Sequence, residues 1–126
     1  MEIREKIARS WEPLQFTLHR EDSFYVCYFA DVMLFSLWIQ HSSWYTGYEE
    51  SMDLILLQAK VPEAENEQIY FEHIRKCLNA YDWKDYGDYV VFSLRQKLKT
   101  GYSIFERGIF KSLRYVPGNG TPVMKK

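Results

Sequence analysis

The sequence predicts a compact, mainly α-helical domain of five to six antiparallel helices. Three observations favour this class. Apolar residues recur every three or four positions over most of the chain after residue 42, two capping boxes mark helix starts, and short turns separate the expected helices. One alternative stays open, because a β-hairpin over residues 14–30 would make the domain α+β. We expect a single domain over residues 1–116, followed by a flexible C-terminal tail over residues 117–126, where Pro and Gly interrupt the chain.

The composition is that of a folded protein. Of the 126 residues, 47% are apolar, 17% aromatic and 26% charged, which excludes a disordered or low-complexity chain. Two cysteines do not make a disulfide framework, and the N-terminus lacks the apolar stretch of a signal peptide, so we expect a cytoplasmic protein.

The net charge of −1 conceals an uneven distribution. Residues 1–83 carry seven basic and 14 acidic side chains, whereas residues 84–126 carry nine basic and three acidic ones. Such an asymmetry either steers a charged partner toward the protein or is neutralised within the folded domain, and the sequence leaves both interpretations open.

The first 20 residues predict a helix and then a strand. Ile3, Ile7 and Trp11 recur at helical spacing among charged residues, which predicts an amphipathic helix over residues 1–11. Apolar and polar residues alternate over residues 14–20, and this period of two is typical of a strand.

The next segment, residues 23–40, is a largely apolar run with one charge. That charge, Asp31, lies in the middle of the run, which argues against a membrane span and favours a buried core element. The length of the run favours a helix that begins at Asp22 and ends near His41, while its many aromatic residues favour a strand over residues 24–30. We expect the helix.

Four further helices are expected in the remainder of the chain. Thr46 with Glu49, and Ser103 with Glu106, have the spacing of capping boxes. Pro62 ends one helix and begins the next, whose first turns are acidic. The expected helices occupy residues 46–61, 62–81, 85–98 and 103–113.

The sequence contains no recognisable catalytic motif. Phosphate-binding glycine-rich loops, the HExxH metalloprotease motif and CxxC pairs are all missing from it. His73 and Cys77 share a helix face and are two potential zinc ligands, but no second pair has a suitable spacing. We therefore expect no metal, no cofactor and no enzymatic activity.

Aromatic residues beside carboxylates form the most unusual pattern. One group surrounds Gly47 and the other surrounds Trp83, and both are expected in turns between helices. Tyr and Trp in such places either anchor protein interfaces or pack helix ends onto the core, and both interpretations stay open. The predicted partner-binding residues are Trp44, Tyr45, Tyr48, Glu49, Glu50, Asp53 and Trp83.

These residues predict a non-enzymatic protein-binding domain. Aromatic anchors among acidic side chains suit a basic partner, so we expect an inhibitor or immunity-type protein that masks the basic surface of a toxin or nuclease. The alternative is a nucleic-acid or phosphate-binding protein that uses a basic helix face formed by Arg107, Lys111 and Arg114. Nucleic acid is the less expected partner, a homo-oligomer stays open, and no membrane association is expected.

Overall fold

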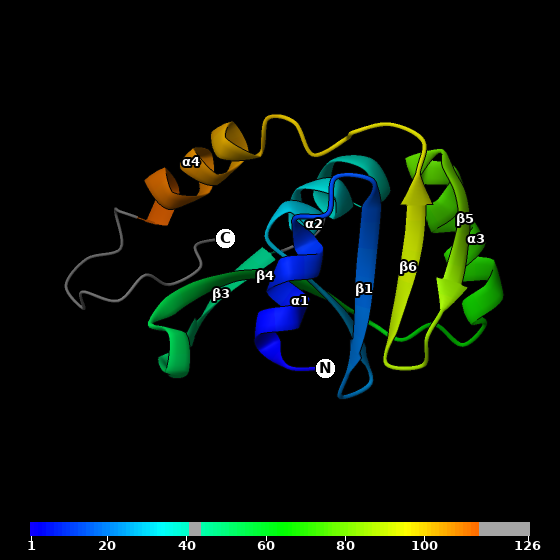
Figure 1. Ribbon diagram of the computed structural model, residues 1–126, viewed down its shortest axis with the longest axis horizontal. Coiled ribbons are helices and arrows are strands. Elements are labelled where there is room, and N and C mark those ends of the chain that lie inside the picture. The colour runs from blue at the N-terminus through cyan, green and yellow to red at the C-terminus, as the bar shows by residue number, and fades with distance from the viewer. Residues whose placement is uncertain (41–43, 114–126) are drawn as a thin grey trace.

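The protein has an α+β fold, which corrects the mainly helical class expected from its sequence. The computed structural model describes residues 1–40 and 44–113 (Figure 1). Six strands form one antiparallel sheet in the order β3-β4-β2-β1-β6-β5. In chain order the elements are α1 (Ile3–Ser10), β1 (Gln15–Glu21), β2 (Phe24–Tyr28), α2 (Ala30–Leu34), the π-helical turn η1 (Phe35–Ile39), β3 (Trp44–Glu49), the 3₁₀ turn η2 (Glu50–Met52), β4 (Leu54–Pro62), α3 (Glu67–Leu78), β5 (Ala80–Asp85), β6 (Tyr89–Leu94) and α4 (Tyr102–Leu113).

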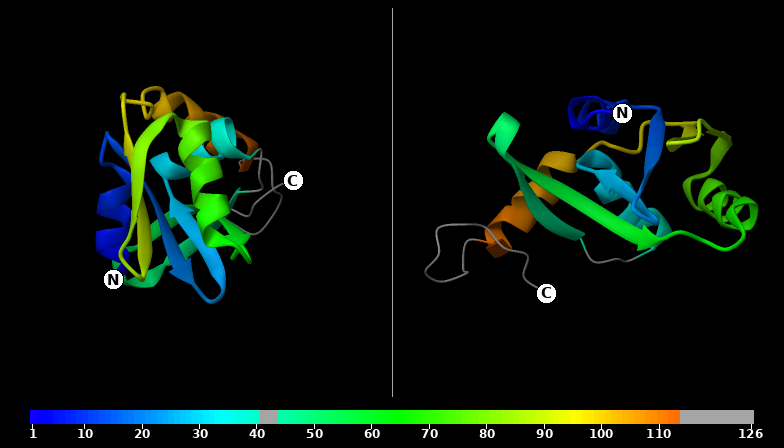
Figure 2. Two further views of the ribbon diagram at one scale, coloured as in Figure 1. Left: turned by 90° about the vertical axis from the view of Figure 1, so that its right-hand side faces the viewer. Right: turned by 90° about the horizontal axis from the view of Figure 1, so that it is seen from below.

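Helices cover both faces of the sheet. α1 lies on one face, where Lys6 reaches Glu21 and Arg9 reaches Tyr89, and α2, η1 and α3 lie on the other (Figure 2). The main core lies between the sheet and α3 and contains a cluster of phenylalanine rings whose centroids are 5.8 to 6.5 Å apart. These rings belong to Phe16, Phe35, Phe71 and Phe92, and all are buried.

The expected helix from Asp22 to His41 is wrong. β1 and β2 form the β-hairpin that is the alternative for residues 14–30, and the chain then enters α2 and η1. The run is nevertheless a buried core element as expected, because every residue from 25 to 35 is buried. A strand and two short helical segments share one apolar run, so its total length favoured the helix wrongly.

The expected helix over residues 46–61 is also wrong, because this segment forms β3 and β4. β4 lies between β3 and β2, and both of its faces are covered in the middle, where Leu56 is 5% exposed and Leu57 0%. A strand buried on both sides carries a continuous apolar run, which hides the alternation that identifies a strand. Pairing with two neighbouring strands thus overrides the local helical pattern.

The expected helix over residues 85–98 is wrong, because this segment contains the last residue of β5, a tight turn and β6. Tyr86 donates its backbone N–H to the carbonyl of Tyr89 at 2.8 Å, which leaves Gly87 and Asp88 as the turn. Gly87 adopts a φ of 93°, a conformation that glycine tolerates. A Gly-Asp pair between β-formers is a hairpin signal, and it outweighs the helical spacing of the apolar residues that follow.

Three expected helices are confirmed in α1, α3 and α4, with shifted ends. α3 begins after Asn66, whose side chain accepts the N–H of Ile69 at 3.2 Å, and it ends at Asn79 in the left-handed conformation. The helix expected over residues 62–81 is therefore shorter. The boundary at residue 116 and the tail over residues 117–126 lie outside the described residues.

Candidate partner-binding site

The predicted aromatic residues of the first group lie on β3, the outer strand of a hairpin that extends from the covered part of the sheet (Figure 2). Tyr48 is 57% exposed. Trp44 is half-buried and packs against the core, and the hydroxyl of Tyr45 donates to Gln58 Oε1 at 2.9 Å. Of these three aromatic side chains, Tyr48 is therefore available to a partner, whereas Trp44 stabilises the hairpin.

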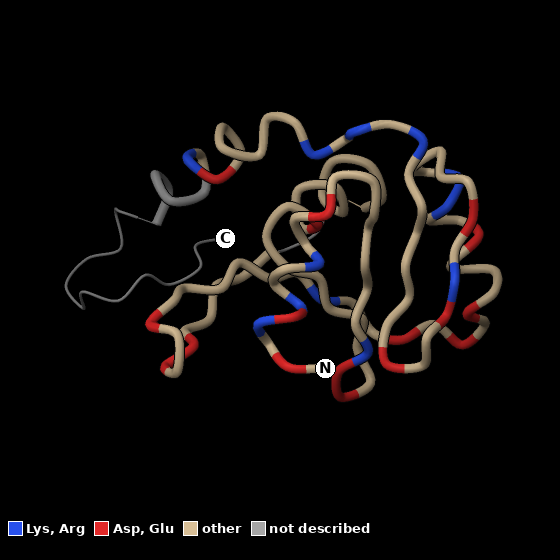
Figure 3. The backbone as a smooth tube through the Cα atoms, in the orientation of Figure 1, with Lys and Arg blue, Asp and Glu red and all other residues tan. Residues whose placement is uncertain are grey.

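The predicted carboxylates gather at the tip of the same hairpin (Figure 3). Glu50 is exposed, the hydroxyl of Ser51 donates to Glu49 at 2.7 Å, and the hydroxyl of Tyr48 donates to Asp53. The hydrogen bond to Asp53 raises the pKa of Tyr48. The tip is thus an acidic surface whose charges are positioned by local hydrogen bonds beside an exposed aromatic ring.

Trp83 does not join this group. It lies on β5, at the opposite edge of the sheet, so the structure places the two predicted aromatic groups far apart in the strand order. Its ring makes an edge contact with Phe71 at 5.2 Å between centroids and packs against the core. The packing interpretation therefore applies to Trp83, and its backbone and strand neighbours are the parts that face outward.

The basic helix face of the alternative hypothesis is described only in part. Arg107 is exposed on α4 and donates its Nε hydrogen to the carbonyl of Ser103 at 3.3 Å. Lys111 lies on α4, where the structure describes the backbone alone, and Arg114 lies outside the described residues. Arg107 alone does not define a phosphate-binding surface.

His73 and Cys77 meet on the exposed side of α3, with His73 Nε2 and Cys77 Sγ 3.6 Å apart. Over residues 1–40 and 44–113, no group of three or more His, Cys, Asp and Glu side chains has a metal-binding arrangement. We assign the pair no chemistry.

Sequence reasoning misses an ion cluster centred on Arg20. Its guanidinium binds both oxygens of Asp85 at 2.8 and 2.9 Å and Glu67 Oε1 at 2.8 Å. The hydrogen bond from Arg20 lowers the pKa of Asp85. Through these contacts Arg20 on β1 binds the first residue of α3 and the last residue of β5. No sequence pattern reveals this cluster, because Glu67 and Asp85 lie 47 and 65 positions after Arg20 in the chain.

A second missed feature is the ion pair between Asp31 and Lys99. Lys99 Nζ lies 2.8 Å from Asp31 Oδ1 and donates to the carbonyl of Ser10 at 2.7 Å, and both charged side chains are buried. A lone charge inside an apolar run is the one signal in the sequence for such a pair, and it identifies Asp31 but not its partner.

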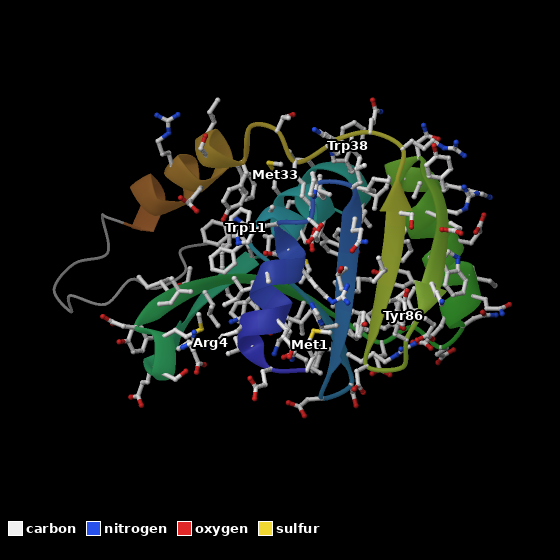
Figure 4. All side chains as sticks on the ribbon, viewed as in Figure 1. Met1, Arg4, Trp11, Met33, Trp38 and Tyr86 are labelled. Carbon is white, nitrogen blue, oxygen red and sulfur yellow. The ribbon has the colours of Figure 1, made fainter. Side chains whose placement is uncertain are left out.

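A small pocket lies beside this ion pair, near the labelled Trp11 in Figure 4. The ring of Trp11 stacks on Phe29 and meets Tyr102 edge-on, with centroids 5.5 and 5.0 Å apart. The pocket measures about 240 Å³, below the range of about 300–1,000 Å³ that is usual for small-molecule sites, so we assign it no ligand.

Comparison of the chain with family models, with curated proteins and with solved structures yields no match. Among the helices that the structure describes, none has both the length and the apolar character needed to cross a membrane.

Proposed function

We propose that the protein is a binding domain whose β3–β4 hairpin takes up a basic, extended segment of another protein. The observation that carries the proposal is the combination, on one hairpin, of a strand edge that no other described strand pairs with, the exposed ring of Tyr48 and an acidic tip. Masking the basic surface of a toxin or nuclease, as an inhibitor or immunity-type protein does, is the biological role that this combination suits.

The open edge supplies hydrogen-bonding groups for a partner strand. Phe29 donates its N–H to the carbonyl of Leu57 at 3.0 Å, so the backbone polar groups of Leu57 face β2. Backbone direction alternates along a strand, so the next residue, Gln58, bonds to Tyr45 in β3. The same alternation leaves the N–H and carbonyl groups of Trp44, Thr46 and Tyr48 pointing away from the sheet, where an extended segment can add as a further strand.

The acidic tip supplies the preference for a basic partner. Glu49, Glu50 and Asp53 lie within five residues of one another, and the described residues form no salt bridge with any of them. Uncompensated charges at an interface rim accelerate association with an oppositely charged protein and disfavour acidic competitors.

A binding measurement tests this proposal. A photo-crosslinking residue at position 48 captures the partner in cells, and the purified partner is titrated against variants. We expect Glu50→Lys to weaken binding at least about tenfold and Tyr48→Ala about thirtyfold, as for a central aromatic contact. Thr46→Pro, which removes an outward N–H without breaking the β3–β4 pairing, also weakens binding.

Glu65→Lys is the matched control, because this exposed carboxylate lies just before α3 and not on the hairpin. Its charge change is identical, so it leaves the dissociation constant within about twofold of the wild-type value if the hairpin is the binding site. Equal affinity of the wild-type protein and all three hairpin variants would show that the partner binds elsewhere.

A further inference from the structure

The sheet has a second open edge at β5. The N–H of Tyr86 bonds to the carbonyl of Tyr89, which directs the backbone of Tyr86 toward β6. Because direction alternates along the strand, Lys84 and Asp82 also pair with β6, and the backbone polar groups of Trp83 point outward. Among the described residues, β6 is the strand that pairs with β5, so this edge is open.

Two opposite charges flank Trp83 on this edge. Asp82 precedes it and Lys84 follows it, and both side chains are exposed. Residues two apart in a strand project from the same face, so both charges lie on the face opposite the Trp83 side chain. Neither charge belongs to a salt bridge of the described residues.

We propose that two copies of the chain pair through β5, antiparallel, about a twofold axis that passes beside Trp83. In this register Trp83 faces Trp83 of the second copy, and their outward backbone groups exchange two hydrogen bonds. Asp82 of each copy then lies directly opposite Lys84 of the other. Opposite charges in this position stabilise strand pairing, and the twofold axis produces the pair twice.

The face of β5 that α3 covers also favours a second copy of the chain as the partner of this edge. Trp83, His73 and Ile69 line an open groove between α3 and β5, and Ile69 is 68% exposed. The twofold axis places the α3 helices of the two copies along the same side of the joined sheet. The exposed apolar surface of Ile69 is then covered by the equivalent groove of the second copy, which adds apolar burial to the backbone pairing.

The self-complementary order of charges distinguishes β5 from β3. In an antiparallel strand pair centred on one residue, the residue before it in one copy lies opposite the residue after it in the other copy. For Trp83 these two residues are Asp82 and Lys84, which have opposite charges. β3 is uncharged from Trp44 to Tyr48, so no twofold register pairs charges along it. We therefore assign the second copy to β5, independently of the partner proposed for β3.

Sedimentation equilibrium of charge variants tests this arrangement. Lys84→Asp and Asp82→Lys each place like charges opposite one another at both positions, so we expect either change to raise the dimer dissociation constant at least about tenfold. The double variant Asp82→Lys/Lys84→Asp regenerates both opposite-charge pairs and restores dimerisation to within about threefold of wild type. An equimolar mixture of the two single variants also forms a mixed dimer.

Glu49→Lys on β3 is the control and leaves the dimer unchanged, and circular dichroism verifies that each variant is folded. A wild-type protein that stays monomeric at millimolar concentration overturns the proposal. The same conclusion follows if the single variants dimerise as the wild type does, or if the double variant does not recover. None of these results depends on the partner of the β3–β4 hairpin.

Discussion

Lys99 Nζ lies 2.8 Å from the carboxylate of Asp31. In the protein interior these two residues join the segment between β6 and α4 to the start of α2. The same ammonium group bonds to the carbonyl of Ser10, the last residue of α1. The second carboxylate oxygen accepts the N–H of Thr17 at 3.3 Å. One ion pair thus connects α1, α2 and the segment before α4 to strand β1, which gives a buried charge a structural role.

Removing one member of this pair leaves a buried charge without its partner. We expect Lys99→Met to lower the free energy of unfolding by about 3–5 kcal/mol, measured by urea denaturation above the Asp31 pKa of about 7, where the carboxylate is ionised. Asp31→Asn/Lys99→Met removes both charges and recovers part of that loss. Lys97→Met, at an exposed lysine two residues earlier, is the control and changes stability by less than about 0.5 kcal/mol. A loss in Lys99→Met as small as in the control would contradict the structural role of the pair.

Asp31 and His19 give opposite pH dependences of stability. Burial raises the pKa of Asp31 from 3.8 to about 7, so the stability that it contributes below pH 3.8 is lost as the pH rises toward 7. Burial lowers the pKa of His19 from 6.5 to about 4, so the stability that it contributes above pH 6.5 is lost as the pH falls toward 4. Between pH 4 and 6.5 the two effects oppose each other.

Single substitutions separate these effects in denaturation curves recorded across this pH range. Asp31→Asn leaves a stability that rises with pH, and His19→Gln leaves one that falls with pH, each by up to about 1.4 kcal/mol per pH unit. The wild-type protein has a shallower dependence than either variant. If all three proteins showed the same slope, neither residue would titrate as its surroundings indicate.

The aromatic residues of the candidate site divide into packing and exposed groups. Trp44 and Trp83 are half-buried against the core, so we expect Trp44→Ala and Trp83→Ala each to lower the free energy of unfolding by about 2 kcal/mol. Tyr48 is 57% exposed, and Tyr48→Ala changes stability by less than about 0.5 kcal/mol. Thermal unfolding of the three variants checks this division, which fails if Tyr48→Ala is as destabilising as the tryptophan changes.

Features that depend on neighbours in the chain are readable from the amino-acid sequence. The amphipathic repeat of Ile3 and Ile7 identified α1, the alternation over residues 14–20 identified β1, and the buried stripe of Phe71 and Ile74 identified α3. In α1 and α3 one side faces solvent. β1 is buried on both sides, with Phe16 and Leu18 on the side of α3 and the polar Thr17 and His19 on the opposite side, so the two sides of each element still differ in polarity at a regular spacing.

The remaining features depend on contacts between elements that are distant in the chain. β4 has a partner strand on each side and is covered on both faces, so Leu56 and Leu57 are both buried and no alternation remains to be detected. The contacts of Arg20 and Lys99 join residues that are distant in the chain. The separation of Tyr48 from Trp83 follows from the strand order, because local spacing records which side of an element is apolar but not which element covers it.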